Sequence, residues 1–525
     1  MLNLCLLSFV FTSLALVIYA EQIPIVDEEL HAEDAAPPQR VAIIGAGIAG
    51  ASAAYWLRDS GWYRVPIVDV YEAESRIGGR VSTECVHDKR YGNLQLQTGA
   101  EIFYTDDQCL QKAINEVGIR GKLSPHYPVK RSVGVWDGQN FIFRAKQDLK
   151  SRTWRDLARS VWQYGLSPAR LKRLVETKIP QFKAVAGARQ YLTRNLPESL
   201  DDHGLSMEYK QSAEQYLFNH SISPNYSREV IQATTRAWFG HDLHEINGLA
   251  GLVAMNAAET DEIMPTLGGM YSLIDRQLKL SGANLHLNSR VTKISRSNGK
   301  NYLLTVEGAD PEGGTDTEST EYDTIIIATP LQGSGLELDL GVTMTDTIPP
   351  YVERHITHFM TSMSITLSPS YFNVSSYENI PRYVFTTPRE TDDGSTDPGF
   401  FHLENSVTTV GLAGCIPIEA RIFKIFSAAP IEDGMIAELF GQPRNSTLED
   451  IGVRWVHRRA WPHASPKFRP GAALLNNFEI ASRVFYTGAS EEIVSSLEMS
   501  CRMGRRTADL AWYSVRRDFD SESEL

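Results

Sequence analysis

The sequence predicts an α/β fold in which a parallel β-α-β domain is interleaved with a mixed α+β lobe. Val41 to Ile44 and Ile67 to Tyr71 are short β-branched runs, and the stretch Ala49 to Leu57 between them has a helical pattern. This strand, helix, strand order is the repeating unit of a parallel sheet. The chain has 525 residues, more than one core usually supports, so a second lobe is expected.

The composition is that of an ordinary globular protein, with 42% apolar and 22% charged residues. The formal net charge is -13. Because nucleic acid binding depends on clustered Lys and Arg, this excess of acidic groups argues against a nucleic acid partner.

The first 20 residues resemble a targeting segment. They carry no charged side chain, run apolar through Val17 and reach Ala20, a small residue that suits signal peptidase. We predict a cleaved signal peptide at 1–20. The alternative is a retained membrane anchor, because no Lys or Arg precedes the apolar run. Residues 21–38 are acidic and end in a Pro pair, which predicts an extended linker.

Sequons, together with the leader, fit a chain of the secretory pathway, destined for the lysosome or vacuole or for secretion. The predicted glycosylation sites are Asn219, Asn225, Asn373 and Asn445. The cysteines after the leader are Cys85, Cys109, Cys415 and Cys501. Their wide spacing matches no metal motif, so we expect no metal site; one or two disulfides remain open.

Beyond the first unit, the chain is predicted to alternate between the two lobes. The predicted segments of the β-α-β domain are 39–105, 264–335 and 471–515. The second lobe comprises a mainly helical segment, 106–263, and a β-rich segment, 336–470. Residues 516–525 are acidic and are predicted to form a loose tail.

A glycine motif follows the first strand. Gly45, Gly47 and Gly50 form GAGIAG at the mouth of the helix, where they allow a tight turn and a close approach of the backbone to a pyrophosphate. Glu72 ends the second strand about 20 residues later, the position at which a carboxylate binds a ribose hydroxyl. Together they predict a Rossmann-type dinucleotide site.

A second glycine motif distinguishes between dinucleotides. Gly78, Gly79 and Arg80 follow Glu72 within ten residues, and VYEAESRIGGR resembles the extension found in the flavin-dependent amine oxidase superfamily. The resemblance implies that the paired glycines and the Arg lie along the FAD diphosphate. FAD is therefore favoured over NAD.

Other segments resemble the same superfamily, in the same order. TGAE at Thr98 to Glu101 resembles the segment beside the isoalloxazine ring, and RVTK at Arg290 to Lys293 the segment whose Val backbone meets adenine. TIIIATP at Thr324 to Pro330 resembles the closing strand, and the segments from Tyr486 and from Leu497 resemble the flavin-contacting terminal strand and helix start. The resemblance further assigns to FAD the residues Gly99, Ala100, Glu101, Val291, Gly488, Leu497 and Glu498.

A narrower resemblance covers nearly the whole mature chain. Val161 to Leu171, Phe423 to Ser427, His463 to Pro470 and Ser495 to Ser500 resemble segments of the prenylcysteine oxidases, also called prenylcysteine lyases. This implies an FAD-dependent thioether oxidase. Its substrate would be farnesyl- or geranylgeranylcysteine, and its products cysteine, a prenyl aldehyde and, with oxygen, hydrogen peroxide.

Two segments depart from that family's pattern. The chain has Trp238 to His241 where an Asn-Tyr-Gly-Gln-like run is expected, and Ser465 to Phe468 where a Tyr-Pro-His-Tyr-like run is expected. If either lines the substrate site, the thioether substrate is in question while FAD is not. His241 is a candidate to activate water or bind the substrate carboxylate, and Arg236 a candidate to pair with that carboxylate.

Three rival functions stay open on the sequence. A flavin amine oxidase is disfavoured, because Thr361 to Leu367, where a Lys is expected near the flavin, contains none. The second rival is an oxidase that tailors a prenylated small molecule, and the third is a non-catalytic FAD-fold binding protein. The amphipathic stretch Arg152 to Trp162 suits either core packing or peripheral membrane contact.

Overall fold

The computed structural model describes residues 38–59, 65–88, 92–100, 103–104, 106–119, 123–125, 132–146, 162–187, 196–259, 262–265, 269–297, 299, 301–309, 315–341, 348–391, 394–410, 418–471 and 478–523. Their elements belong to one compact unit, Gln39–Leu525. The predicted signal peptide and all of the predicted linker except Pro38 lie outside the described residues.

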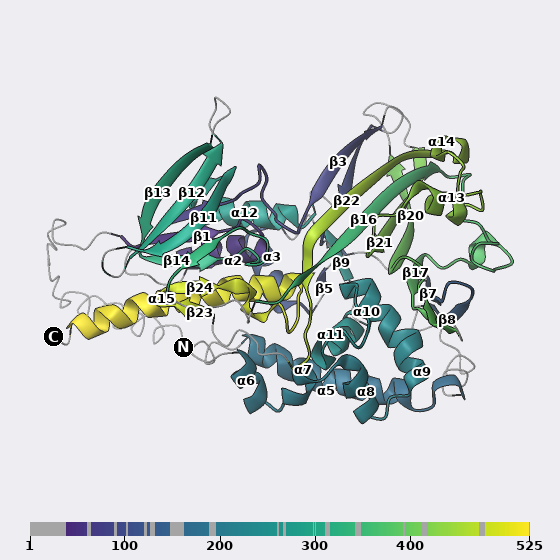
Figure 1. Cartoon of the computed structure of the whole chain (residues 1–525), viewed down its shortest axis with the longest axis horizontal. Helices are drawn as coiled ribbons and strands as arrows, with labels where there is room; N and C mark the ends of the chain where they lie inside the picture. The colour runs from purple at the N-terminus through teal and green to yellow at the C-terminus, as the bar shows by residue number, and fades with distance from the viewer. Residues whose placement is uncertain are drawn as a thin grey trace, which may run out of the picture. The chain divides into compact units, whose positions relative to one another are not determined.

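A six-stranded sheet with the order β10-β2-β1-β14-β24-β23 organises the first lobe (Figure 1). Its central strand β1 (Arg40–Ile44) is parallel to β2 (Ile67–Tyr71) and β14 (Thr324–Ile327). The outer strands are the parallel β10 (Asn284–His286) and β24 (Val484–Tyr486) and the antiparallel β23 (Glu479–Ala481). Three distant stretches of chain thus build one sheet, and the predicted interleaved α/β fold is confirmed.

The two faces of this sheet are covered by different layers. Val41 and Ile43 pack into a core shared with helices, whereas Ala42 and Ile44 pack against a second sheet, β13-β12-β11-β15. Burial on both faces explains the nearly continuous apolar run of β1. The helices are α2 (Ile48–Asp59), α3 (Gln108–Glu116), α12 (Tyr271–Ser281) and α15 (Leu497–Ser523). The second sheet contains β11 (Ser289–Arg296), β12 (Tyr302–Ala309), β13 (Thr315–Tyr322) and β15 (Glu337–Asp339).

The second lobe contains a seven-stranded sheet, β22-β16-β21-β20-β17-β7-β8, in which β22 and β16 run side by side as long strands (Figure 1). Phe359, Phe423 and Leu403 project from one face into a core that includes α13 (Asp433–Leu439) and α14 (Leu448–Ile451). The strands are β22 (Val453–Pro466), β16 (Tyr351–Ser362), β21 (Ile418–Ser427), β20 (His402–Val410), β17 (Tyr383–Thr386), β7 (Ser132–Trp136) and β8 (Phe141–Lys146).

The helical part of this lobe packs around Tyr216 and Phe468, both fully buried. Its helices are α5 (Ser167–Gly187), α6 (Leu196–Asp202), α7 (Ser206–Lys210), α8 (Ala213–Asn219), α9 (Pro224–Tyr226), the π-helical turn η4 (Ser227–Ile231), α10 (Gln232–Phe239) and α11 (Gly248–Glu259).

Short elements complete the structure. They are the ribbon β3 (Thr83–Asp88) and β4 (Gly92–Gln97), the sheet β5 (Phe103–Tyr104), β9 (Glu262–Pro265) and β6 (Leu123–Pro125), the ribbon β18 (Arg389–Thr391) and β19 (Gly394–Thr396), and the 3-10 turns η5 (Tyr377–Asn379) and η6 (Thr487–Ser490).

The end of α15 corrects one prediction. The helix continues to Ser523, so most of the predicted loose tail at 516–525 is helical. Extending an existing helix fixes one residue for each new hydrogen bond, and acidic composition alone does not stop that propagation. None of the helices in the described part of the chain combines the length and the apolar character that a membrane span requires.

Candidate active site

The two glycine motifs lie against each other at the end of β1. Gly45 has a φ of 107°, and its amide donates to the Tyr71 carbonyl at 2.7 Å. Gly47 forms a parallel bridge with Gly78, whose amide donates to the Ala46 carbonyl at 2.9 Å. Neither turn has room for a larger residue, because a Cβ on Gly45 would lie 2.9 Å from the Ala328 carbonyl oxygen and a Cβ on Gly78 would lie 2.4 Å from the Val81 carbonyl oxygen. No side chain of these glycines therefore covers the backbone where a diphosphate approaches.

Gly50 explains why the helix follows the strand so closely. A Cβ at this position would lie 1.9 Å from the Gly45 carbonyl oxygen, so only glycine lets α2 begin directly after the turn. The amides of the first turn of α2 then point towards the glycine loop, where a helix N-terminus favours phosphate.

Glu72 sits beside this turn at the end of β2. Its carboxylate is 9% exposed and accepts hydrogen bonds from the amides of Ala46 and Glu74, both at 2.9 Å. Burial raises the pKa of Glu72, and these two amides partly oppose the rise. The chain after β10 also docks here, because the Ser289 amide donates to the Glu72 carbonyl at 2.8 Å. Val291 on β11 is brought near the same corner and is buried.

Arg80 joins the first lobe to the second. Its Nη2 lies 2.5 Å from Glu491 Oε1, and its Nη1 donates to the Ala464 carbonyl of β22 at 3.3 Å. Tyr351, at the start of β16, donates its hydroxyl to the other oxygen of Glu491 at 2.7 Å. Burial lowers the pKa of Arg80, but Glu491, through its charge and its hydrogen bond, acts together with Tyr351 and Tyr486 in the opposite direction, and the net shift is upward.

The predicted flavin segment runs beside Arg80. The Ala100 amide donates to the Arg80 carbonyl at 3.0 Å, and a Cβ on Gly99 would lie 2.2 Å from that carbonyl oxygen. Trp461 of β22 donates its indole N–H to the Thr98 carbonyl at 2.7 Å. Glu101 lies outside the described residues. Gly99 and Ala100 are thus held between the glycine motifs and the large sheet.

At the C-terminal end, Gly488, Leu497 and Glu498 are the residues that the resemblance assigns to FAD. Gly488 is buried in η6, directly after β24, and Leu497 begins α15. The Glu498 carboxylate accepts the amides of Cys109 at 2.9 Å and Leu110 at 3.0 Å, as well as Arg502 Nε at 2.6 Å. It therefore caps the N-terminus of α3, a role the sequence did not indicate.

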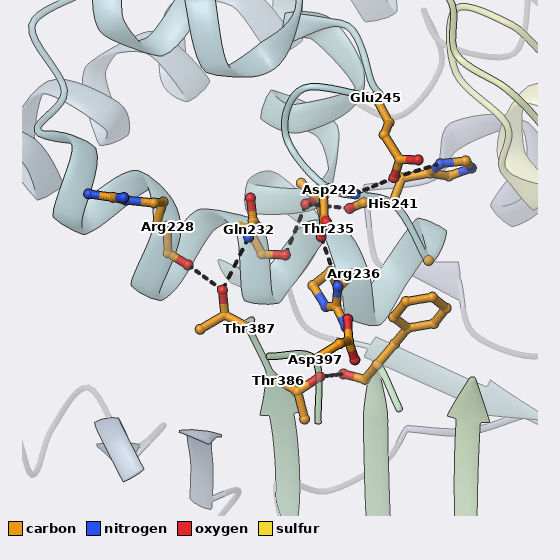
Figure 2. Close-up of polar contacts among 12 residues, drawn as sticks. Arg228, Gln232, Thr235, Arg236, His241, Asp242, Glu245, Thr386, Thr387 and Asp397 are labelled. Atoms are coloured by element: carbon orange, nitrogen blue, oxygen red, sulfur yellow. Dashed lines mark hydrogen bonds and ion pairs between the residues drawn. The ribbon is translucent and has the colours of Figure 1, made fainter. Parts of the chain in front are cut away.

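Arg236 does not have the role suggested for it. It lies on α10, 2% exposed, and its two Nη atoms pair with Asp242 at 2.9 Å and Asp397 at 2.6 Å (Figure 2). Its guanidinium also lies 4.8 Å from the centre of the Phe401 ring. The prediction that it pairs with a substrate carboxylate is therefore corrected: two internal carboxylates already balance its charge. Asp397 lies far along the sequence, which is why spacing could not reveal it.

His241 is likewise enclosed. It is 2% exposed, and its Nδ1 lies 3.5 Å from Glu245 Oε2 (Figure 2). Its ring is nearly perpendicular to that of Phe468, with ring centres 5.4 Å apart. Burial lowers the pKa of His241, although Glu245 opposes the shift. Phe239 also packs on Phe468, with ring centres 5.3 Å apart. The two segments that depart from the family pattern thus pack on each other, which favours a structural role for His241.

Among the described residues, no group of His, Cys, Asp or Glu could hold a metal ion. The residues described above instead fit FAD: a bare glycine turn at a helix start, a buried carboxylate beside it and an arginine on the second glycine motif.

Comparison with known proteins agrees with this geometry. The chain matches the model of the prenylcysteine lyase family over residues 147–523 and an NAD(P)-binding Rossmann-like domain over residues 43–117. It is 25% identical to prenylcysteine oxidase 1 of Bos taurus, covering 92% of this chain and 90% of that protein. It is 24% identical to farnesylcysteine lyase of Arabidopsis thaliana, covering 90% and 88%.

Solved structures share the fold. Cyclohexylamine oxidase from Brevibacterium oxydans aligns with a TM-score of 0.55 at 16% identity, covering 91% of this chain and all (100%) of that one. A putative protoporphyrinogen oxidase from Exiguobacterium aligns with a TM-score of 0.57 at 14% identity, covering 92% and 100%. The family model extends over most of the sequence and both lobes, so this chain belongs to the prenylcysteine lyase family.

Proposed function

We propose that this protein is an FAD-dependent thioether oxidase that cleaves farnesyl- or geranylgeranylcysteine. The observation that carries the proposal is the contact between the Gly47 and Gly78 motifs in a chain of the prenylcysteine lyase family. Together with Glu72 and Arg80, these motifs form one binding site for the cofactor, here called the cofactor track. In the overall reaction the thioether, oxygen and water give a prenyl aldehyde, free cysteine and hydrogen peroxide.

The cofactor and the protein have different parts in this reaction. When bound along the glycine motifs, FAD would supply a two-electron acceptor for the hydride of the carbon next to sulfur, with oxygen as the final oxidant. The sulfur lone pair assists hydride removal, so the protein has mainly to hold that carbon in place. Water adds to this carbon, and cysteine leaves as the thiol. The described geometry assigns no residue as a general base.

Arg80, Glu491 and Tyr351 support the proposal at the border of the two lobes. Their contacts connect the second glycine motif to the start of β16 in the seven-stranded sheet. The same sheet reaches the predicted flavin segment through Trp461 and Thr98. These contacts fix the large sheet against the cofactor track, as a substrate-positioning wall requires.

We propose that the protein acts in the secretory pathway. The asparagines of all four sequons are exposed, as glycosylation requires. A peripheral membrane contact is a further proposal, supported by Trp162 at 89% exposure and Leu166 at 60%. Residues 152–161 of the predicted amphipathic stretch lie outside the described residues.

The membrane contact is tested by Trp162→Ala in a liposome sedimentation assay. Met207→Ala, which removes another exposed apolar side chain (52%), is the matched control. We expect the first variant to sediment less with vesicles than the second. Equal sedimentation of both variants and the unmodified protein contradicts the proposal.

A further inference from the structure

Two cysteines that are far apart in the chain meet in the core of the first lobe. Cys109 lies in the first turn of α3 and is 6% exposed, and Cys501 lies in the second turn of α15 and is 0% exposed. Both side chains belong to one hydrophobic cluster with residues of β1, α2 and α12. A hydrogen bond joins the two thiols, so their sulfur atoms are neighbours.

The backbone explains how the two thiols meet. The Glu498 carboxylate of α15 accepts the Cys109 amide at 2.9 Å, so the start of α15 is held at the start of α3. Cys501 follows Glu498 by three residues, and residues with this spacing share one face of a helix. The Cys501 side chain therefore lies on the face of α15 that meets α3.

A third helix encloses the pair. A Cβ on Gly504 would lie 2.2 Å from the Ala49 carbonyl oxygen, so glycine lets α15 lie directly on α2. Ser52 of α2 forms a hydrogen bond with the Cys501 thiol, and its hydroxyl also accepts one from Gln277 at 3.4 Å. The two thiols are thus held between α2, α3 and α15, which fixes their position relative to each other.

The other cysteines after the leader are placed differently. Cys85 on β3 is exposed, and Cys415 lies outside the described residues. Among the described cysteines, Cys109 and Cys501 are therefore the pair that shares a core. The compartments of the secretory pathway are oxidising, and disulfides form and persist there.

Burial also determines when the two cysteines can react. It raises the pKa of the Cys501 thiol well above its usual value, and Cys109 and Glu498 act in the same direction while Ser52 opposes them. The thiolate is the form that attacks a disulfide. The folded core therefore protects these thiols from exchange, so a bond between them has to form while the chain folds, before α15 packs on α3.

We propose that Cys109 and Cys501 form a disulfide that joins α3 to the start of α15. The proposal rests on the proposed secretory route, because the oxidant is a disulfide of that compartment, either a small molecule or a protein. One cysteine attacks this disulfide, and the second then displaces it from the mixed intermediate. The bond between Cys109 and Cys501 forms, the incoming sulfur–sulfur bond breaks, and its two halves leave as thiols with the two protons.

This bond would stabilise the lobe that holds the cofactor. It closes a loop that spans most of the chain, and the restriction that a disulfide places on the unfolded chain grows with the length of the loop. It also fixes Leu497 and Glu498, which the family resemblance assigns to FAD, beside α3. We therefore expect the disulfide to raise the stability of this lobe.

Peptide mapping of the full-length chain from a eukaryotic secretory host tests the pairing. The protein is denatured in iodoacetamide without reductant, digested, and analysed by mass spectrometry before and after reduction. We expect the Cys109 and Cys501 peptides as one cross-linked species that separates on reduction, with neither cysteine alkylated beforehand. Alkylation of both cysteines, or a link from either of them to Cys85 or Cys415, overturns the proposal.

Thermal unfolding with and without a phosphine reductant is a second measurement. The reductant should lower the thermal midpoint by about 3–5 °C more in the unmodified protein than in the double variant Cys109→Ala/Cys501→Ala, which has no bond to lose. Cys85→Ala is the matched control, because it removes an exposed thiol and should keep the full shift. Equal shifts in the unmodified protein and the double variant contradict the proposal. If the double variant does not fold, the peptide map of the unmodified protein decides.

Treatment with peptide N-glycosidase tests the secretory route separately, through the loss of glycan mass. A glycosylated chain in which both cysteines are alkylated overturns the disulfide and leaves the route intact. A chain that has neither glycans nor the disulfide overturns the route, and the inference with it.

Discussion

At the scale of single residues, the cofactor assignment depends most on Glu72. Its carboxylate is buried where β2 meets the glycine turn, and it already accepts two amides. A ribose hydroxyl would add a third donor to the same charged group.

Glu72→Ala is therefore expected to weaken FAD binding by about 10- to 100-fold, the cost of losing hydrogen bonds to a charged group. Titration of the apoprotein with FAD, followed by flavin fluorescence, measures the change. Glu74→Ala is the control, because the Glu74 side chain is half exposed and pairs only with Arg76 in the described structure. An equal loss of affinity in both variants would contradict a specific role for Glu72.

Gly50→Ala tests the strand-to-helix turn. The added Cβ would lie 1.9 Å from the Gly45 carbonyl oxygen, so α2 must move away from β1. We expect a lower thermal midpoint and loss of bound flavin. Gly118→Ala is the control for backbone strain without a clash: Gly118, unlike Gly50, has a positive φ, 74°, and a Cβ there meets nothing within 4 Å. Its expected cost is about 1–2 kcal/mol without loss of flavin.

The roles of residues that satisfy the local geometry of the backbone were predictable from the sequence. Gly45, Gly50 and Gly78 are required by a turn or a close approach that neighbouring residues define. Arg236 and His358 were not predictable in this way. The partners of Arg236 include Asp397, and His358 comes to lie between Lys424 and His457 only because β16, β21 and β22 pair in one register.

At the scale of elements, the contact between α15 and α3 stabilises the lobe that holds the cofactor. Glu498 and Arg502 are an ion pair, 7% and 8% exposed, and Glu498 also caps α3. Removing one partner leaves a buried charge unpaired. Glu498→Ala is therefore expected to lower the free energy of unfolding by roughly 3–5 kcal/mol.

Thermal unfolding with bound flavin as a second readout measures this effect. Glu116→Ala, which removes only an i,i+4 ion pair with Lys112 on α3, is expected to cost less than about 0.5 kcal/mol. A similar shift in both variants would show that the Glu498 cap contributes little.

The start of α3 also predicts a pH dependence. Burial, and then the charge of Glu498, raises the pKa of Asp107 to about 7. Because the folded state holds this proton more tightly than the unfolded state, the contribution to stability is full below about pH 4 and is lost as pH rises through about 7. Asp107→Asn should therefore reduce the fall in thermal midpoint between pH 5 and pH 8, and an unchanged fall would contradict it.

Element prediction succeeded where periodicity and the glycine motifs agreed, as in β1, α2 and β2. It failed at the C-terminus, where an acidic segment was expected to be loose and α15 continues to Ser523. It also could not assign β12 to the second sheet, because a β-rich run does not reveal which sheet it joins.

At the scale of the whole molecule, the proposed secretory route predicts glycosylation. The sequon asparagines Asn219, Asn225, Asn373 and Asn445 are all exposed. Expression in a eukaryotic secretory host should therefore give a protein whose mass falls on treatment with peptide N-glycosidase. Replacement of all four by Gln should abolish that shift, and a chain without any shift before replacement contradicts the route.

The interleaved order of the two lobes brings the second glycine motif and the predicted flavin segment against the seven-stranded sheet, through contacts of Arg80 with Ala464 and of Trp461 with Thr98. The sequence resemblance identified the family, which the match over residues 147–523 confirms. It could not show which residues of the two lobes come into contact, because those residues are far apart in the chain.

Anaerobic reduction of the bound flavin tests the central claim most directly. The purified FAD-loaded protein is mixed with S-farnesylcysteine, S-geranylgeranylcysteine or a panel of primary and polyamines, and the flavin absorbance is followed before air is admitted. The proposal predicts bleaching by a prenylcysteine but not by amines, followed in air by hydrogen peroxide and a prenyl aldehyde in equal amounts. A flavin that amines reduce and prenylcysteines do not would contradict it.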